Sequence, residues 1–204
     1  MTRKAARKTA PGRDQCADQD RSHNESRTGN LDGRMLLHGL PPVLPAQPRL
    51  LILGSMPGAA SLSAACYYAH PRNQFWPIMG ALFGAAPERP YAERLQILQA
   101  QGIALWDVVG SCRRSGSLDS AIERDSVHFN PIDILLQDNP SIGHIICNGG
   151  TAMRLLRQGF RQVLAIHWPD LTIRQLPSTS PAHAAMRPAD KLAAWREILD
   201  YTEV

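Results

Sequence analysis

Several features that identify common protein classes are missing from this chain of 204 residues. No uninterrupted apolar run approaches the roughly 18 residues that a membrane-spanning helix needs. The four cysteines stand far apart with no Cys-x-x-Cys pair, so neither a zinc site nor an iron–sulfur cluster is indicated. The basic N-terminus has no apolar stretch behind it and does not resemble a secretory signal. We therefore expect a cytoplasmic protein without a membrane partner and without a metal.

The common nucleotide and hydrolase motifs are also absent. The turn Gly-Ser-Met-Pro-Gly at residues 54–58 is too short for a phosphate-binding P-loop and lacks its lysine. It also lacks the glycine spacing of a dinucleotide-binding turn. A Gly-x-Ser-x-Gly nucleophile elbow occurs nowhere, which argues against an α/β-hydrolase.

Charge divides the chain into two parts. Residues 1–34 hold eight basic and five acidic side chains and almost no large apolar ones, a composition typical of a disordered tail. Residues 35–204 hold 14 basic and 13 acidic side chains and have the composition of one globular domain. Because this domain is nearly neutral, binding of nucleic acid would need a local basic patch.

Predicted strands and helices alternate along residues 35–204. Apolar runs predict strands at 50–53, 103–109, 142–147, 163–166 and 171–176. Helical spacing and end signals predict helices at 73–83, 88–101, 151–158 (ended by Gly159) and 188–201, and another opened by Asn130 as its cap. This order predicts an α/β fold with a mainly parallel central sheet and helices on both faces.

Polar loops follow four of these strands. They come after Leu53, around 107–112, after Cys147 and at 177–183. Parallel strands bring their carboxyl ends to one edge of a sheet, where ligands bind in open α/β folds. The stretch 67–76 adds four aromatic side chains and several polar ones within ten residues, so we expect a pocket at this edge.

These segments together resemble the uracil-DNA glycosylase superfamily. The turn at 54–58 is similar to its first motif, and Leu-Pro-Ser-Thr-Ser-Pro-Ala-His at 176–183 is similar to its last. The string Tyr-Tyr-Ala-His-Pro-Arg-Asn-Gln-Phe-Trp at 67–76 is similar in particular to the hypoxanthine (deoxyinosine) DNA glycosylase branch, as are Ser-Leu-Asp-Ser at 117–120 and the Cys-Asn-Gly segment. The resemblance covers roughly residues 38–202 and implies a three-layer α/β sandwich.

The resemblance implies that Asn73 is catalytic. Many members place Asp or Asn in the first turn and His at the start of the last motif, where this chain has Met56 and Leu176. The resemblance to the hypoxanthine branch implies that the asparagine at position 73 takes over the positioning of the attacking water from these residues. Its carbonyl can hold the attacking water, since hydrolysis through an oxocarbenium-like sugar needs a placed water more than a strong nucleophile. The alternative role for Asn73 is a helix N-cap.

The remaining roles follow from the same resemblance. A target base must be flipped into a pocket and stacked on a ring. The residues expected to form the base pocket are Gly54, Ser55, Met56, Pro57, Tyr67, Tyr68, Phe75, Asp107 and Asn148. Those expected to contact DNA are His70, Arg72, Ser178, Thr179, Ser180 and His183. For each, a structural role in the core, a cap or a solvated turn is the alternative.

The sequence thus predicts a monofunctional DNA glycosylase that releases a deaminated base, hypoxanthine first, in base-excision repair. No lysine lies within the motifs to form a Schiff base with the sugar. We expect a monomer that binds damaged DNA and needs no cofactor. The alternatives are a glycosylase directed at uracil or xanthine, and a non-catalytic module that binds a nucleobase or nucleotide.

Overall fold

A computed structural model describes residues 35–202, which form two sheets and six α-helices. The central sheet has four parallel strands in the order β3-β2-β6-β7. They are β2 (Leu50–Gly54), β3 (Ile103–Asp107), β6 (His144–Asn148) and β7 (Thr172–Leu176). The predicted tail at 1–34 lies outside the described residues.

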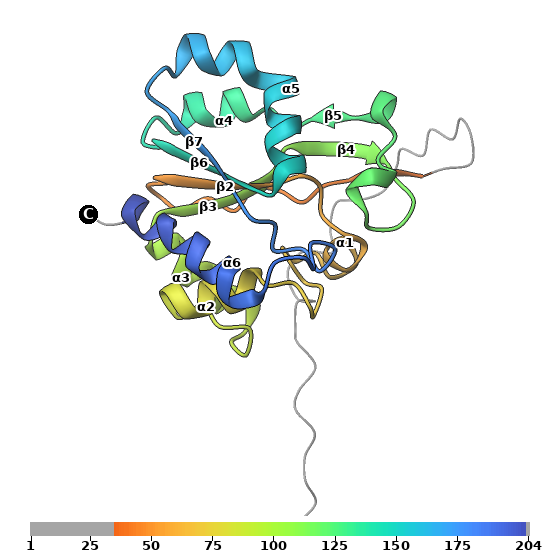
Figure 1. Cartoon of the computed structure of the whole chain (residues 1–204). Helices are drawn as coiled ribbons and strands as arrows, with labels where there is room; N and C mark the ends of the chain where they lie inside the picture. The colour runs from red at the N-terminus through yellow and green to blue at the C-terminus, as the bar shows by residue number, and fades with distance from the viewer. Residues whose placement is uncertain (1–34, 203–204) are drawn as a thin grey trace, which may run out of the picture.

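Helices cover both faces of the central sheet (Figure 1). On one face lie α4 (Ile132–Asp138) and α5 (Gly150–His167). On the other lie α2 (Phe75–Phe83), α3 (Tyr91–Ala100) and α6 (Pro188–Trp195), which runs into a 3-10 helix at Arg196–Tyr201. The predicted α/β architecture with helices on both faces is confirmed.

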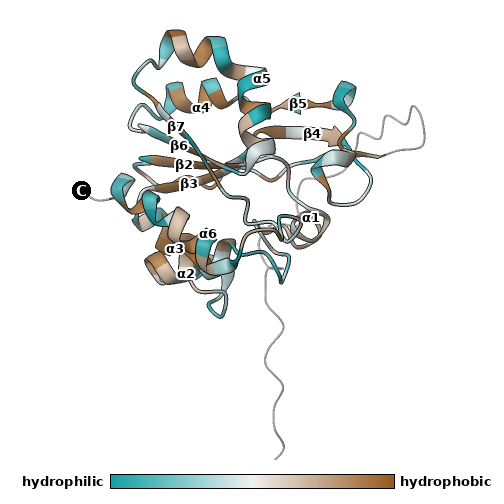
Figure 2. Ribbon diagram, in the orientation of Figure 1, coloured by the Kyte–Doolittle hydropathy of each residue, from teal (hydrophilic) through white to brown (hydrophobic). Residues whose placement is uncertain are grey.

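Alternate residues of β2 point to the two layers. Leu50 and Ile52 join the core beneath α2, α3 and α6, whereas Leu51 and Leu53 join the core beneath α4 and α5. All four side chains are fully buried, as expected for a central parallel strand with an uninterrupted apolar run. Figure 2 shows this apolar character along the sheet.

A second, antiparallel sheet packs beside the first in the order β1-β4-β5. Its strands are β1 (Leu36–His38), β4 (Val109–Arg113) and β5 (His128–Phe129). The apolar run at 103–109 was predicted as one strand, but the chain leaves the parallel sheet after Asp107 and enters the second sheet at Val109. The chain then continues through 3-10 helices at Asp119–Ala121 and Arg124–Ser126.

Helix α5 contradicts two predictions. Its 18 residues run through Gly159, which was predicted to end a helix, and through 163–166, which was predicted as a strand. Gly159 is retained inside the helix because an added Cβ would lie 3.0 Å from the Phe129 ring. The buried positions of α5, such as Leu156, Phe160 and Leu164, keep helical spacing across the glycine.

The other helices follow the predictions with shifted ends. Helix α2 begins two residues after Asn73 and ends at Gly84, whose φ of 80° suits a glycine C-cap. Asn130 was predicted to cap α4, but its amide instead donates a hydrogen bond of 2.8 Å to the carbonyl of Asp107. Among the described residues, no helix has both the length and the apolar character needed to cross a bilayer.

Candidate active site

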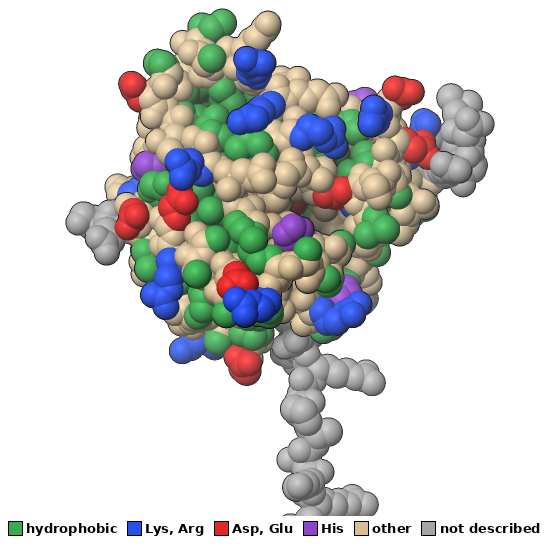
Figure 3. Space-filling model, viewed as in Figure 1, with side chains coloured by type: hydrophobic (Ala, Val, Ile, Leu, Met, Phe, Trp, Pro, Cys, Tyr) green, Lys and Arg blue, Asp and Glu red, His purple; other side chains and the backbone are tan. Residues whose placement is uncertain are grey.

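A cavity of about 640 Å³ opens at the carboxyl edge of the parallel sheet. The four polar loops predicted from the sequence converge on it, and so does the short helix α1 (Ala59–Ala64). Figure 3 shows the face of the molecule on which this edge lies, with a hollow that carries an acidic side chain and a histidine at its rim. The predicted meeting of the strand-end loops is therefore observed.

The first turn forms one wall of the cavity. Gly54, Ser55, Met56 and Pro57 all line it, as predicted from the motif. The carbonyls of Gly54 and Ser55 each accept a hydrogen bond of 2.9 Å, from the N–H groups of Val108 and Val109 respectively. The turn is thus fixed to the segment where the chain passes from one sheet to the other.

Asp107 lies at the end of β3, directly beside Gly54 of β2. It is 3% exposed, and its Oδ2 has no hydrogen-bond partner among the described residues. Burial, and to a smaller extent the negative charge of Asp119, raise the pKa of this carboxyl, and the Arg114 guanidinium opposes them; the net pKa is about 7. Near neutral pH the group can accordingly act as either a hydrogen-bond acceptor or a donor.

Two tyrosines and a phenylalanine cluster beside Asp107, and two of these three rings stack. The ring of Tyr68 lies flat against Phe75, with centroids 3.9 Å apart and an interplanar angle of 22°. Tyr68 has a φ of 57°, a strained value for a non-glycine residue, and its buried hydroxyl has no partner with hydrogen-bond geometry. Burial raises the pKa of this phenol, while the nearby Asn148 amide lowers it in part.

Phe75 departs from the prediction that it lines the base pocket. Its side chain is fully buried and makes an edge contact with Trp195, so it supports Tyr68 from behind. Tyr67 does line the cavity, although its hydroxyl donates to the carbonyl of Pro41 at 3.0 Å. Tyr68 is the ring at this wall that is best placed to stack on a base.

Asn73 lines the same cavity and is half-buried. Its Oδ1 accepts a hydrogen bond of 2.9 Å from the N–H of Phe75, at the first turn of α2. The N-cap of α2 is Gln74, so Asn73 supports the start of the helix from one residue before the cap and is not the N-cap itself. This bond is compatible with catalysis because an amide oxygen has a second lone pair. The Asn73 amide nitrogen makes no hydrogen bond within the described residues.

Asn148 is held from one side by the last loop. Its Oδ1 accepts from the Thr179 N–H at 2.9 Å, and its Nδ2 donates to Thr179 Oγ1 at 2.9 Å. These two bonds fix the amide orientation and leave one N–H and one lone pair for a ligand. The next residue, Gly149, has a φ of 98°, and an added Cβ there would lie 2.8 Å from Ser178.

The residues predicted to contact DNA are placed in three different ways. His70, Ser178, Ser180 and His183 line the mouth of the cavity. Arg72 is exposed but does not line it. Thr179 was predicted to offer its hydroxyl to DNA; instead its side chain is fully buried and bound to Asn148, because it joins the last loop to β6.

A wall of the cavity that the sequence analysis did not assign comes from the second sheet. The loop at 114–120 carries three polar side chains that fasten it to the first turn and to α1. Arg114 donates to the Pro57 carbonyl, and Ser117 Oγ accepts from the Ala59 N–H at 3.0 Å. Ser55 Oγ lies 2.8 Å from each carboxylate oxygen of Asp119. The Ser-Leu-Asp-Ser segment in the resemblance was the signal that could have indicated this wall.

Comparison with known proteins identifies the family. A model described as the uracil DNA glycosylase superfamily matches residues 41–201, which is well over half of the chain. The chain belongs to the uracil DNA glycosylase superfamily. It is accordingly a DNA glycosylase, a hydrolase of N-glycosyl bonds whose substrate is DNA. The family suggested by the two motifs is confirmed.

Individual members of the superfamily are similar to this glycosylase. Two relatives named hypoxanthine DNA glycosylase come from Methanosarcina barkeri and Methanosarcina acetivorans. The first is 35% identical over 116 residues, 56% of this chain and 72% of the relative. The second is 34% identical over 119 residues, 58% of this chain and 74% of the relative.

The fold of the glycosylase is also similar to a solved structure. A solution NMR structure of a protein from Methanosarcina acetivorans, provisionally assigned as a uracil DNA glycosylase, matches with a TM-score of 0.65 and 29% identity. The match covers 81% of this chain and 99% of that protein. The likeness therefore extends over most of the fold.

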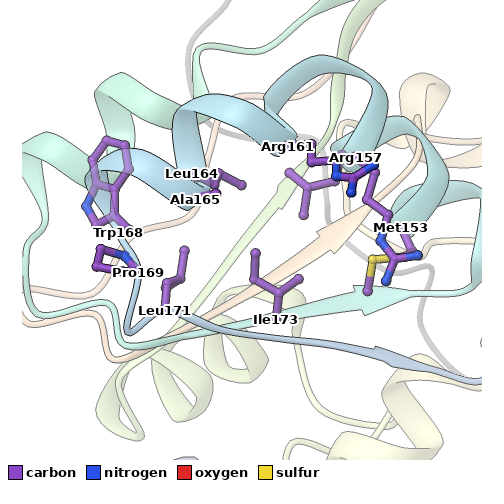
Figure 4. A pocket seen from close by; sticks show the side chains of 10 residues that line it. Met153, Arg157, Arg161, Leu164, Ala165, Trp168, Pro169, Leu171 and Ile173 are labelled. Carbon is purple, nitrogen blue, oxygen red and sulfur yellow. The ribbon is translucent and has the colours of Figure 1, made fainter.

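A second cavity of the glycosylase lies apart from these loops. It measures about 240 Å³ and lies between α5 and β7, with Leu164, Trp168 and Ile173 among its apolar lining and the exposed Arg157 and Arg161 at its rim (Figure 4). None of the residues predicted for the active site lines it. The chemistry of the family is therefore assigned to the larger cavity.

Proposed function

We propose that this DNA glycosylase releases hypoxanthine from deoxyinosine in DNA and is monofunctional. The observation that supports it most is the convergence of Asn73, Asp107 and Asn148 on one cavity at the carboxyl edge of the sheet. The names of the two Methanosarcina relatives, hypoxanthine DNA glycosylase, point to the same base.

Base recognition is assigned to Asp107 and Asn148. Hypoxanthine has an N–H donor at N1 where adenine has an acceptor, and it has a carbonyl oxygen where adenine has an amino group. The buried Oδ2 of Asp107 has no hydrogen-bond partner among the described residues, which costs free energy. A base that supplies a donor removes this cost by pairing with the oxygen. The remaining N–H of Asn148 suits a carbonyl oxygen. Adenine presents an acceptor at N1 to the ionised Asp107 and an amino donor to the Asn148 N–H, so it would leave both groups unpaired when Asp107 is ionised.

Hydrolysis is assigned to Asn73. The deoxyribose passes through an oxocarbenium-like transition state, and the attacking water must be held on the face opposite the departing base. The second lone pair of Asn73 Oδ1 can orient this water while the first accepts the Phe75 N–H. Because the bond to Phe75 already fixes the amide, the Asn73 side chain loses little further entropy when it orients the water.

The placement of lysine supports a monofunctional mechanism. Lys191 is the only lysine of residues 35–204, and its side chain does not line the cavity. Its Nζ donates to the carbonyl of His183 at 2.8 Å, behind the last loop. An amine held there cannot attack the sugar to form a Schiff base.

The direct test measures base release from duplexes that carry inosine, uracil or xanthine at one position. Purified protein is incubated with each duplex, and abasic sites are detected by strand scission after alkali. We expect the fastest release from inosine and no scission before alkali is added. Release of uracil or xanthine faster than hypoxanthine would transfer the proposal to that base, and scission without alkali would contradict the monofunctional mechanism.

Two substitutions separate the catalytic role of Asn73 from its helix-start role. Serine can accept the Phe75 N–H but is too short to reach the water, whereas alanine can do neither. We expect Asn73→Ala to lower the free energy of unfolding by about 1 kcal/mol and Asn73→Ser to lower it less. Both should reduce the single-turnover rate by at least about a hundredfold, the scale of general catalysis by one positioned group. An Asn73→Ser protein that keeps its excision rate would show that the residue only supports the start of the helix.

A further inference from the structure

We infer that Leu118 is the apolar wedge that enters the DNA duplex where the target base has left it, delivered by the loop of the second sheet. The inference rests on the DNA glycosylase activity but not on which base is released. It concerns the loop at 114–120, for which the sequence analysis assigned no role in DNA binding.

Leu118 is an exposed leucine in an unusual place. Its side chain is 56% exposed, and within the described residues the other large apolar side chains of comparable exposure are Met35, Leu36, Ile134 and Ile166. Of these, Leu118 alone lines the active-site cavity. Exposing a leucine to water costs on the order of 1 kcal/mol or more, which a protein recovers if the side chain becomes buried on binding.

The exposure of Leu118 is imposed by its neighbours. Ser117 is tied to the N–H of Ala59 at 3.0 Å, and Asp119 is tied to Ser55 at 2.8 Å. Arg114, itself buried, fastens the start of the loop to the Pro57 carbonyl. With anchors on both sides, Leu118 is held outward at the rim of the cavity and cannot fold back into the core. A preorganised side chain loses little entropy on binding.

The last loop offers the cavity no apolar side chain as long as Leu118, since its apolar lining residues are Pro181 and Ala182. The last loop, residues 177–183, reads Pro-Ser-Thr-Ser-Pro-Ala-His and contains no large apolar side chain. His70, on the segment leading to α2, is polar. Base flipping leaves a gap in the stack and costs a few kcal/mol, and proteins that disturb stacking insert an apolar side chain between base steps. Leu118 is the group at this cavity with the chemistry and position for that insertion.

The test compares duplex with single-stranded DNA, since only a duplex has a paired stack to refill. For Leu118→Ala we expect the single-turnover release of hypoxanthine from duplex DNA to fall about tenfold or more, and release from the single-stranded oligonucleotide to change less than about twofold. Leu118→Met, which keeps a long apolar side chain, should retain most of the duplex rate. Ile134→Ala is the matched control, because it removes an exposed apolar side chain of α4 that does not line the cavity.

A binding measurement decides the matter even if hypoxanthine is not the released base. Each variant is titrated with a duplex that holds a stable abasic-site analogue and with the same duplex undamaged. We expect Leu118→Ala to weaken binding to the abasic duplex about tenfold and to leave binding to the undamaged duplex unchanged. Equal losses of release rate on duplex and single-stranded substrates would overturn the inference. So would a Leu118→Ala protein that keeps both its release rate on duplex DNA and its affinity for the abasic duplex. Absence of hypoxanthine release by the unaltered protein would instead overturn the proposed base.

Discussion

Among single residues, Asp107 has the environment that most affects both stability and chemistry. A carboxyl group at the end of a buried strand loses its hydration, and the neighbouring Asp119 charge adds to the cost of ionising it. Arg114 compensates only in part. The site therefore keeps a group that binds a proton near neutral pH at the position that we propose for base recognition, a placement typical of functional residues.

The pH dependence of stability tests this account of Asp107. The folded protein has a pKa of about 7 at this carboxyl against an ordinary value of 3.8. Below about pH 4 both the folded and unfolded states hold the proton, and above about pH 7 neither does. Between these limits only the folded state holds it, so the free energy of unfolding should fall as pH rises, by up to about 4 kcal/mol.

Asp107→Asn has the same shape and does not titrate, so it is the matched variant. We expect its free energy of unfolding, from urea denaturation at several pH values, to change much less between about pH 4 and pH 7 than that of the unaltered protein. Parallel pH profiles for the two proteins would show that the Asp107 carboxyl ionises without hindrance and is not desolvated as described.

At the scale of elements, the register between β2 and β3 sets the floor of the cavity. Gly54 and Asp107 are paired at the ends of these parallel strands. A Cβ on Gly54 would lie 2.2 Å from Asp107 Oδ1 and 3.6 Å from the Tyr68 hydroxyl oxygen. The absence of a side chain at Gly54 thus lets the Asp107 carboxylate and the Tyr68 ring approach the strand end together.

Gly54→Ala should therefore damage activity more than folding. The clash is with a side-chain oxygen, so the carboxylate can turn away, but it then leaves its position for base recognition. We expect kcat/KM on inosine duplex to fall by at least about tenfold, with a loss of about 1–3 kcal/mol in the free energy of unfolding. Gly84→Ala is the control variant, because Gly84 does not line the cavity. Its φ is positive, but an added Cβ would contact no other atom, so only the backbone conformation constrains this position. Gly84→Ala should lower stability without changing kcat/KM; unchanged kcat/KM for Gly54→Ala would contradict this account of the floor.

For the whole molecule, Thr179 connects three segments that are distant in the sequence. Its hydroxyl and N–H bind Asn148 at the end of β6, and its carbonyl accepts from the Gln74 N–H at 2.9 Å. The catalytic candidate Asn73 is adjacent to Gln74, so the last loop fixes the positions of two site residues at once. The side chain first interpreted as a DNA contact is thus a structural link between the walls of the site.

Thr179→Val and Thr179→Ser test this link. Valine keeps the shape of threonine but removes the acceptor for the Asn148 amide and leaves that donor unpaired. We expect Thr179→Val to lose about 1–3 kcal/mol of stability and to lower kcat/KM on inosine duplex, whereas Thr179→Ser should retain most of both. Denaturation curves and single-turnover rates provide the two readouts. A Thr179→Val protein with unaltered excision would show that Asn148 needs no such support.

The sequence allowed much of this architecture to be predicted because buried parallel strands have a clear signal. The runs at 50–53, 142–147 and 171–176 are short, apolar and followed by polar turns, and each became a strand. The predictions that a helix ends at Gly159 and that a strand follows at 163–166 were wrong. A glycine that packs against Phe129 looks the same in the sequence as a glycine that ends a helix. Only the contact distinguishes them.

By itself the sequence determined the α/β class, the loops that would meet and the family to which the motifs belong, because strand periodicity and motif spacing are local properties of the chain. Only the tertiary structure decided which side chains face the cavity. It moved Phe75 and Thr179 into supporting roles, and it brought Asp119 and Leu118 from the second sheet to the rim. Those assignments depend on contacts between segments far apart in the sequence, such as Ser55 with Asp119 and Phe75 with Trp195, which no local pattern records.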